Sequence, residues 1–178
     1  MRITAATAAL AVCGVLFTSA CSSSTTGPEP GGGGQVEYVE VTEGHLIFQV
    51  PQSWKKSSDA SKPFTVRYSG DGMQLQAAGE LGDDSGAYTA LARLDLPATV
   101  GLSGYQPGTT NRITVNGAHD AVAREFTYTD GSSTKHGVWI VATQWPYPKS
   151  AALTITGTQV DPDVASHIQE NLQFKTYH

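Results

Sequence analysis

Beyond residue 35, hydrophobic and polar residues follow one another in a series of short segments. Leu46, Phe48 and Val50 fall on one side of the first segment. The same period of two, typical of a half-buried strand, recurs over residues 64–68, 73–77 and 121–129, and apolar runs of strand length occupy residues 112–115, 135–143 and 151–157. Turn-forming residues follow at 69–72, 116–117 and 130–133. Strands joined by such short turns pair antiparallel, so the pattern predicts an antiparallel sheet.

Two segments depart from this period and predict helices. Residues 87–96 are rich in helix formers; residues 83–85 offer capping side chains before them, and Pro97 is expected to end the helix. The second helix begins after Asp161, a typical N-cap residue followed by proline. Its apolar stripe consists of Val164, Ala165, Ile168 and Leu172. We therefore expect an α+β domain over residues 36–178, with two helices packed on an antiparallel β-sheet.

The N-terminus predicts export and lipidation. A short basic start is followed by an uncharged, apolar run over residues 3–17, which is too short to span a membrane comfortably and fits a signal peptide. The small residues 18–20 precede Cys21 and together with it resemble a bacterial lipobox, in which the cysteine receives a diacylglycerol and often a further acyl chain such as palmitate. Because Thr18 stands where the lipobox usually has leucine, a secreted and unanchored protein is the alternative.

A polar stretch then separates Cys21 from the domain. Residues 22–35 contain Ser, Thr, Gly, Pro, Glu and Gln but no large apolar side chain, so they predict a flexible tether. A chain of this length reaches about 20 Å on average. We expect a signal peptide over residues 1–20 and a lipidated cysteine with its tether over 21–35. The domain would then lie at the outer face of the cell membrane.

Charge and cysteine content narrow the function classes. The formal net charge is −5, and no basic cluster exceeds Lys55-Lys56. Nucleic-acid binding and electrostatic docking on anionic lipid are therefore not expected, and acyl chains would supply the membrane contact. Of the two cysteines, Cys13 would leave with the signal peptide and Cys21 would be acylated. The domain should then fold without a disulfide, as about 140 residues can.

Three short motifs follow one another along the chain: residues 48–54 (FQVPQSW), residues 102–105 (LSGY) and residues 168–174 (IQENLQF). In this order they resemble the PsbP-like fold family, which includes photosystem PsbP proteins, Ran-binding Mog proteins and Lpq-type lipoproteins of actinobacteria. The resemblance covers residues 36–175 and implies a binding or assembly role without catalytic residues. We expect no cofactor. Some Lpq-type members are linked to envelope lipid and glycolipid processes.

Catalytic and metal-binding patterns are weak. Gly101–Gly104 falls one residue short of a hydrolase nucleophile elbow. Ser-x-x-Lys occurs at 53–56 and at 132–135, without the partner motifs of penicillin-binding enzymes. The five histidines include no His-x-x-x-His pair; His119-Asp120 would meet His136 if their strands are neighbours, but surface histidines and no metal site are the expectation.

Aromatic residues mark a candidate contact site. Trp145 and Tyr147 alternate with Pro146 and Pro148 between two apolar strands, which predicts a stiff hairpin tip. Such a tip could contact a sugar, a lipid or a partner protein. In the alternative, Trp145 folds back over the edge of the core. Trp54 and Trp139 are expected in the core.

These observations favour a non-catalytic binding or adaptor module. It would hold an envelope glycolipid or contact an envelope transport or assembly protein. A small envelope hydrolase and a structural or antigenic surface protein are the alternatives. A mostly apolar groove with few titratable groups would favour binding, whereas a nucleophile with a base in reach would favour hydrolysis.

Overall fold

The computed structural model describes residues 36–176 of the chain. The expected signal peptide, Cys21 and the tether lie outside these residues, as do Tyr177 and His178. The described residues all belong to one compact unit.

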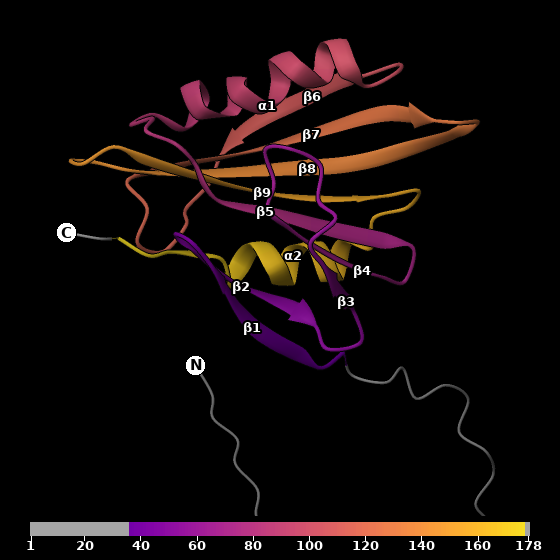
Figure 1. Ribbon diagram of the computed structural model, residues 1–178, viewed down its shortest axis with the longest axis horizontal. Helices are drawn as coiled ribbons and strands as arrows, with labels where there is room; N and C mark the ends of the chain where they lie inside the picture. Colours follow the sequence, from indigo (N-terminus) through magenta and orange to yellow (C-terminus); the bar gives the residue numbers. More distant parts are fainter. Residues whose placement is uncertain (1–35, 177–178) are drawn as a thin grey trace, which may run out of the picture. The chain divides into compact units, whose positions relative to one another are not determined.

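A seven-stranded sheet forms the centre of this unit (Figure 1). Every strand in it pairs antiparallel with its neighbours. Across the sheet the order is β3 (Lys55–Ser57), β4 (Val66–Gly70), β5 (Met73–Gly82), β9 (Lys149–Gly157), β8 (Ser133–Gln144), β7 (Asp120–Asp130) and β6 (Gln106–Arg112). Most of these strands were expected, whereas the short edge strand β3 and the exposed edge strand β6 carry no clear alternation of their own.

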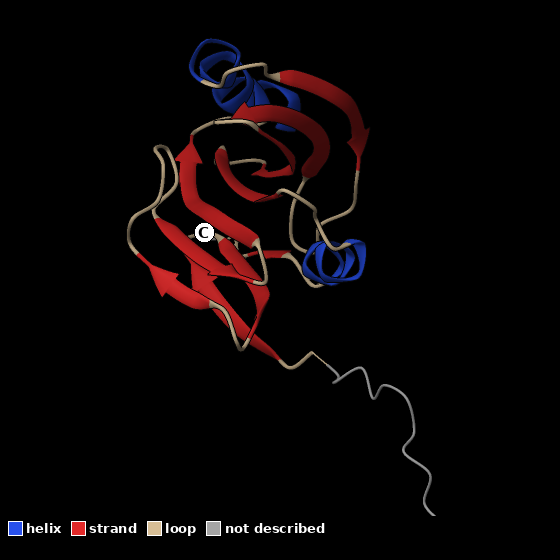
Figure 2. Ribbon diagram, turned by 90° about the vertical axis from the view of Figure 1, so that its right-hand side faces the viewer, coloured by secondary structure: helices blue, strands red, loops and turns tan. Residues whose placement is uncertain are grey.

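Two helices and a second, smaller sheet cover the faces of the large sheet. Helix α1 (Ala87–Gly101) lies on one face, and helix α2 (Pro162–Glu170) lies on the other (Figures 1 and 2). The small sheet shares the α2 side and consists of β1 (Tyr38–Glu43), β2 (Leu46–Pro51) and β10 (Gln173–Phe174), with β2 in the middle. The expected α+β architecture is confirmed.

The alternation along the strands divides the interior into two apolar clusters. On the α2 side, Ile140, Leu153 and Ile155 are almost fully buried and pack with Phe48 of β2 and Ile168 of α2. On the α1 side, the core combines Leu91 and Leu94 of α1 with Val122, Phe126, Trp139 and Val141 of the sheet. Burying each large side chain contributes about 1.5–3 kcal/mol, so both faces of the sheet stabilise the fold.

The two sheets touch at a pair of glycines. Gly44, in the turn between β1 and β2, has a φ of +52°, which favours glycine. A Cβ atom on Gly79 of β5 would stand 1.9 Å from the backbone oxygen of Glu43. The neighbouring His45 N–H donates to the Gly79 carbonyl at 3.0 Å. The two backbones can approach this closely only because both residues are glycines.

Helix α1 differs from the expectation at both ends. It continues through Pro97 to Gly101, although proline cannot donate to the carbonyl four residues earlier. Leu94 and Ala98, on either side of the proline, are both buried against the core, and this packing holds the helix together. At the other end, none of the side chains at 83–85 caps the helix. Its N-cap is Gly86, and the Ala87 N–H donates instead to Asp120 at 3.1 Å.

The expected hairpin at Asn116-Gly117 is also wrong. Strand β6 ends at Arg112, and residues 113–119 form a longer loop before β7. The loop is drawn inward because Val115 is buried in the core. The Asn116 carbonyl accepts a hydrogen bond from Phe174 N–H at 2.7 Å, and Gly117 lies against the Phe174 carbonyl. The Asn-Gly pair therefore holds the C-terminal strand β10.

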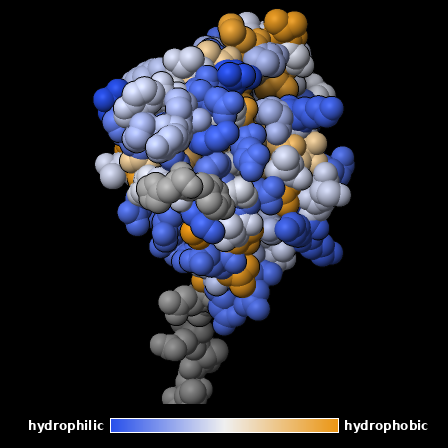
Figure 3. Space-filling view, turned by 60° about the vertical axis from the view of Figure 1, so that its left-hand side comes forward, coloured by the Kyte–Doolittle hydropathy of each residue, from blue (hydrophilic) through white to orange (hydrophobic). Residues whose placement is uncertain are grey.

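Other sequence expectations are confirmed. Helix α2 begins at the predicted cap, where the Asp161 carboxylate accepts from Asp163 N–H at 2.9 Å, and it leads into β10. Trp54 and Trp139 are both buried. Within residues 36–176, none of the helices combines the length and apolar character that crossing a bilayer requires. The outer side of α1 nevertheless exposes Tyr88, Leu96 and Val100, and hydrophobic side chains gather there at the top of Figure 3.

Candidate functional site

The turn between β8 and β9 exposes both predicted aromatic residues. Gln144 pairs with Lys149 across the hairpin, so residues 145–148 form the turn. The side chain of Trp145 is 57% exposed and that of Tyr147 is 69% exposed. Of the two arrangements left open by the sequence, the structure shows the projecting tip and not a Trp145 folded over the core. A contact role for the two residues stays a prediction.

Polar contacts fix the base of this tip against the segment before α1. Lys149 Nζ lies 2.6 Å from Asp83 Oδ1, and this hydrogen bond lowers the pKa of Asp83 and raises the pKa of Lys149. The neighbouring Asp84 accepts from Ser150 Oγ at 3.0 Å and from Arg93 Nε at 2.7 Å. Exposed pairs such as Lys149–Asp83 add little free energy. Their effect is to hold the hairpin in one direction.

The segment after α1 has a structural role. Gly104 has a φ of +60°, and the Ser103 carbonyl accepts from Thr129 N–H at 2.7 Å. The Tyr105 hydroxyl donates to Asp95 at 2.7 Å. Burial, followed by this hydrogen bond, raises the pKa of Tyr105 far above its ordinary value, so the phenol keeps its proton. The near-match to a nucleophile elbow at 101–104 therefore marks a helix end.

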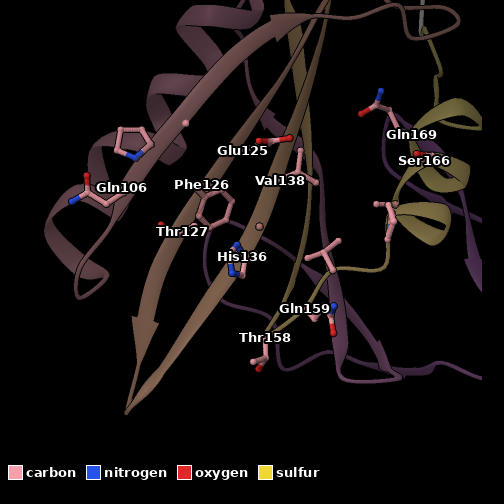
Figure 4. A pocket seen from close by; sticks show the side chains of 16 residues that line it. Gln106, Glu125, Phe126, Thr127, His136, Val138, Thr158, Gln159, Ser166 and Gln169 are labelled. Carbon is pink, nitrogen blue, oxygen red and sulfur yellow. The ribbon is translucent and has the colours of Figure 1, made fainter.

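A groove of about 950 Å³ opens on the other side of the sheet, and we call it the α2 groove (Figure 4). It lies between α2 and the part of the sheet where β6, β7 and β8 run side by side. Its lining comprises Gln106, Pro107, Gly108, Glu125, Phe126, Thr127, His136, Gly137, Val138, Thr158, Gln159, Val160, Pro162, Ala165, Ser166 and Gln169. The volume is within the usual range of ligand sites.

The groove forms because one side of α2 faces the core and another side faces solvent. Val164 and Ile168 point into the core, whereas Ala165, Ser166 and Gln169 line the groove. On the opposite wall, β6 carries a bulge between Pro107 and Thr110 and passes close to β7 at Gly108, where a Cβ atom would stand 2.9 Å from the Glu125 carbonyl oxygen. The sequence did not reveal this site because its walls come from four segments that are distant along the chain.

The chemistry of the lining is largely uncharged. Glu125 and His136 are its titratable side chains, and the other polar groups are amides and hydroxyls. Ser166 lies on α2, across the groove from the strands that carry Glu125 and His136 (Figure 4). In the described part of the chain, no hydrogen bond joins Ser166 to either of them. A nucleophile needs its base within about 2.6–3.2 Å, so these three residues do not form a hydrolytic site as they stand.

The pairing register of β7 and β8 separates the histidines that the sequence suggested as a metal site. Asp120 pairs with Thr143 and His136 pairs with Thr127, so His119-Asp120 and His136 lie at opposite ends of the β7–β8 pair. The combination of these residues considered from the sequence is therefore wrong. Across residues 36–176, no group of three or more His, Cys, Asp or Glu side chains could hold a metal ion. In the Ser-x-x-Lys motif at 132–135, the Lys135 ammonium donates to Thr158 Oγ1 at 2.8 Å and not to Ser132.

The arrangement of helices on antiparallel sheets is consistent with a Mog1/PsbP-like fold. Over 79% of its length the chain superimposes on the crystal structure of the yeast (Saccharomyces cerevisiae) Ran-binding protein Mog1p, covering 96% of that chain with a TM-score of 0.51 and 10% identity. It also superimposes on LpqN of Mycobacterium tuberculosis, described as involved in cell envelope biogenesis. That match covers 79% of this chain and 92% of LpqN, with a TM-score of 0.50 and 14% identity.

Sequence comparisons add no closer assignment. No family model matches the chain, and no curated protein matches it. At such low identities the structural matches show the fold and nothing finer.

Proposed function

We propose that this chain is a cell-envelope lipoprotein whose domain binds the head group of an envelope glycolipid without catalysing a reaction. The signal-like N-terminus and the expected acylation of Cys21 support the location at the outer face of the membrane. The shared fold with LpqN, a protein described as involved in cell envelope biogenesis, supports the same setting.

The α2 groove is the observation that carries this proposal. Sugar hydroxyls need many neutral donors and acceptors, and the lining supplies the amides of Gln106, Gln159 and Gln169 together with three hydroxyls. Val138 and Val160 add apolar surface for ring C–H groups or the first part of an acyl chain. Few charges have to be desolvated when a neutral ligand enters, so the lining suits a sugar better than an ionised head group.

The first experiment blocks the groove from α2. Ser166 is exposed and lines the groove, so Ser166→Tyr should fill it without disturbing the core. The probe is dodecyl maltoside below its micelle-forming concentration, titrated into the full-length protein and followed by calorimetry. We expect affinity to fall at least about tenfold, equivalent to ~1.4 kcal/mol, with an unchanged melting temperature.

Glu170→Tyr is the matched control, since Glu170 is an exposed residue of the same helix that lies outside the lining. It should bind the maltoside like the wild type. Dodecylphosphocholine, which has the same alkyl chain but no sugar, should bind more weakly. Equal affinity for both detergents, or equal loss in both tyrosine variants, would show that the groove does not select a sugar.

A specific observation also favours contact with an envelope transport or assembly protein as a second candidate function. Trp145 and Tyr147 project from a short turn whose base is fixed by hydrogen bonds. Binding energy in protein interfaces concentrates on a few aromatic or arginine residues, and a preordered loop loses less entropy on contact. The tip lies at the end of β8 opposite to the groove, so the two candidate functions can be tested separately.

The double variant Trp145→Ala, Tyr147→Ala tests this contact. We expect capture of a crosslinked membrane partner to weaken by at least ~2 kcal/mol, the usual threshold for a dominant interface residue. The melting temperature should stay the same because both side chains are exposed. The double variant Leu96→Ala, Val100→Ala removes exposed apolar surface from α1 and should capture the partner normally. Undiminished capture by the tip variant, or a marked drop in its melting temperature, would show that Trp145 and Tyr147 have a structural role and do not contact a partner.

A further inference from the structure

A second cavity, of about 280 Å³, lies on the α1 face of the large sheet. We call it the α1 cavity. Leu94, Pro97 and Ala98 of α1 form one wall, and residues 61–64, in the connection between β3 and β4, form another. Trp139 and Tyr128 of the sheet complete its apolar surface. The α2 groove opens on the opposite face, and the two linings share Phe126 alone.

The floor of the α1 cavity is unusually polar for the interior of a sheet. Cross-strand register places Gln76 beside Thr154 and Gln74 beside Thr156, which makes two polar pairs on adjacent strands β5 and β9. Gln76, Thr154 and Thr156 are between 3% and 7% exposed. Under α1 the same face of the sheet is apolar and carries Ala152, Val141 and Val122.

The polar groups of this floor are only partly satisfied. Gln76 Oε1 accepts from Ser61 N–H at 2.6 Å, which leaves the amide hydrogens of Gln76 available. Thr154 Oγ1 is buried and has no hydrogen-bond partner. Thr156 Oγ1 differs, because a weak hydrogen bond with the Tyr128 hydroxyl opposes the rise in the pKa of Tyr128 that burial causes.

An unpaired buried hydroxyl costs free energy, and natural proteins keep few of them. Thr154 Oγ1 is such a group, and it lines a cavity, so a molecule inside the cavity could satisfy it. The charged residues that line the cavity are Lys62 and Arg93, and both are exposed. Arg93 is already paired with Asp84. The floor itself carries no formal charge, and burying an ion on it would therefore be unfavourable.

We propose that the α1 cavity binds a small uncharged molecule with an apolar body and two neighbouring hydroxyl oxygens on one side. The oxygens would exchange hydrogen bonds with Thr154, Thr156 and the Gln76 amide, while the apolar body lies against Leu94, Pro97 and Trp139. This site does not depend on the sugar-binding role of the α2 groove.

Thr154→Val tests the proposal because it removes the hydroxyl and keeps the shape of the side chain. The probe is trans-cyclohexane-1,2-diol, titrated into the full-length protein by ligand-observed NMR. We expect the diol to bind the wild type and to bind Thr154→Val at least about tenfold more weakly. Cyclohexanecarboxylate, of similar size but anionic, should bind more weakly than the diol. Ser166→Tyr should bind the diol like the wild type.

Thermal melting without ligand provides a second measurement. Thr143→Val is the matched variant, since Thr143 is fully buried on the same sheet but its hydroxyl donates to carbonyls of Ser85 and Asp120 at 3.2 Å. We expect Thr143→Val to lower the melting temperature and Thr154→Val to leave it unchanged or raise it. Failure of the diol to bind, equal binding by Thr154→Val, preference for the carboxylate, or a Thr154→Val melting temperature as low as that of Thr143→Val would each overturn the proposal. The last result would mean that a structural water satisfies the hydroxyl.

Discussion

Replacing Gly79 by alanine is expected to destabilise the domain by more than about 4 kcal/mol, at the upper end of what single substitutions do. The added Cβ atom would stand 1.9 Å from the backbone oxygen of Glu43, and neither backbone can rotate away as a side chain can. The small sheet would have to move off β5, which breaks the hydrogen bond between His45 and Gly79. Chemical denaturation of the purified protein measures the loss directly.

Gly101→Ala is the matched control. Gly101 is the last residue of α1, and a Cβ atom there has no heavy atom within 4 Å. Alanine should be neutral or should stabilise the helix by up to about 1 kcal/mol, because glycine is the more costly residue in a helix. Similar midpoints for Gly79→Ala and the wild type would mean that the two sheets do not meet as closely as the structure shows.

Cys21→Ala is expected to abolish acylation of the protein completely. Each buried CH₂ of an acyl chain contributes about 0.8 kcal/mol of membrane affinity, so loss of two chains removes far more than any surface contact of the domain supplies. The intact mass of the wild-type protein extracted from membranes should exceed the mass from Cys21 onward by the attached lipid. The variant should carry no lipid, and its mass will distinguish a released domain from an uncleaved precursor.

Cys13→Ala provides the control for this experiment. Cys13 lies within the expected signal peptide, so its replacement should leave both the final mass and the membrane association unchanged. A wild-type protein whose mature mass contains no acyl chain would contradict the lipoprotein assignment and favour the secreted, unanchored alternative.

The sequence predicted those parts of the fold that depend on local signals. The strand that contains Phe126 and the helix after Asp161 were predicted correctly because alternation and N-capping depend only on residues that are close in sequence. The usual effects of Pro97 and Asn116-Gly117, which end a helix and form a tight hairpin, are overridden by packing. Leu94 and Ala98 bury the helix on both sides of Pro97, and the buried Val115 turns the loop inward where a tight hairpin had been expected.

The candidate sites were less accessible to sequence reasoning. The tip at Trp145 could be found because its aromatic and proline residues are consecutive. The α2 groove could not, since Glu125, His136 and Ser166 share no motif. The polar floor of the α1 cavity was hidden for another reason: Thr154 alternates within an apolar strand as a solvent-facing residue would, and only the fold shows that this face is covered.

Strand β8 carries the groove near one end and the tip at the other. His136 lines the groove, and Gln144 is the last residue of the strand before the turn. At about 3.3 Å per residue, the eight steps from one to the other span roughly 26 Å. Energetic coupling between sites so far apart is usually small. If both proposed contacts exist, a ligand in the groove and a protein at the tip would therefore bind independently and could be present on one domain at the same time.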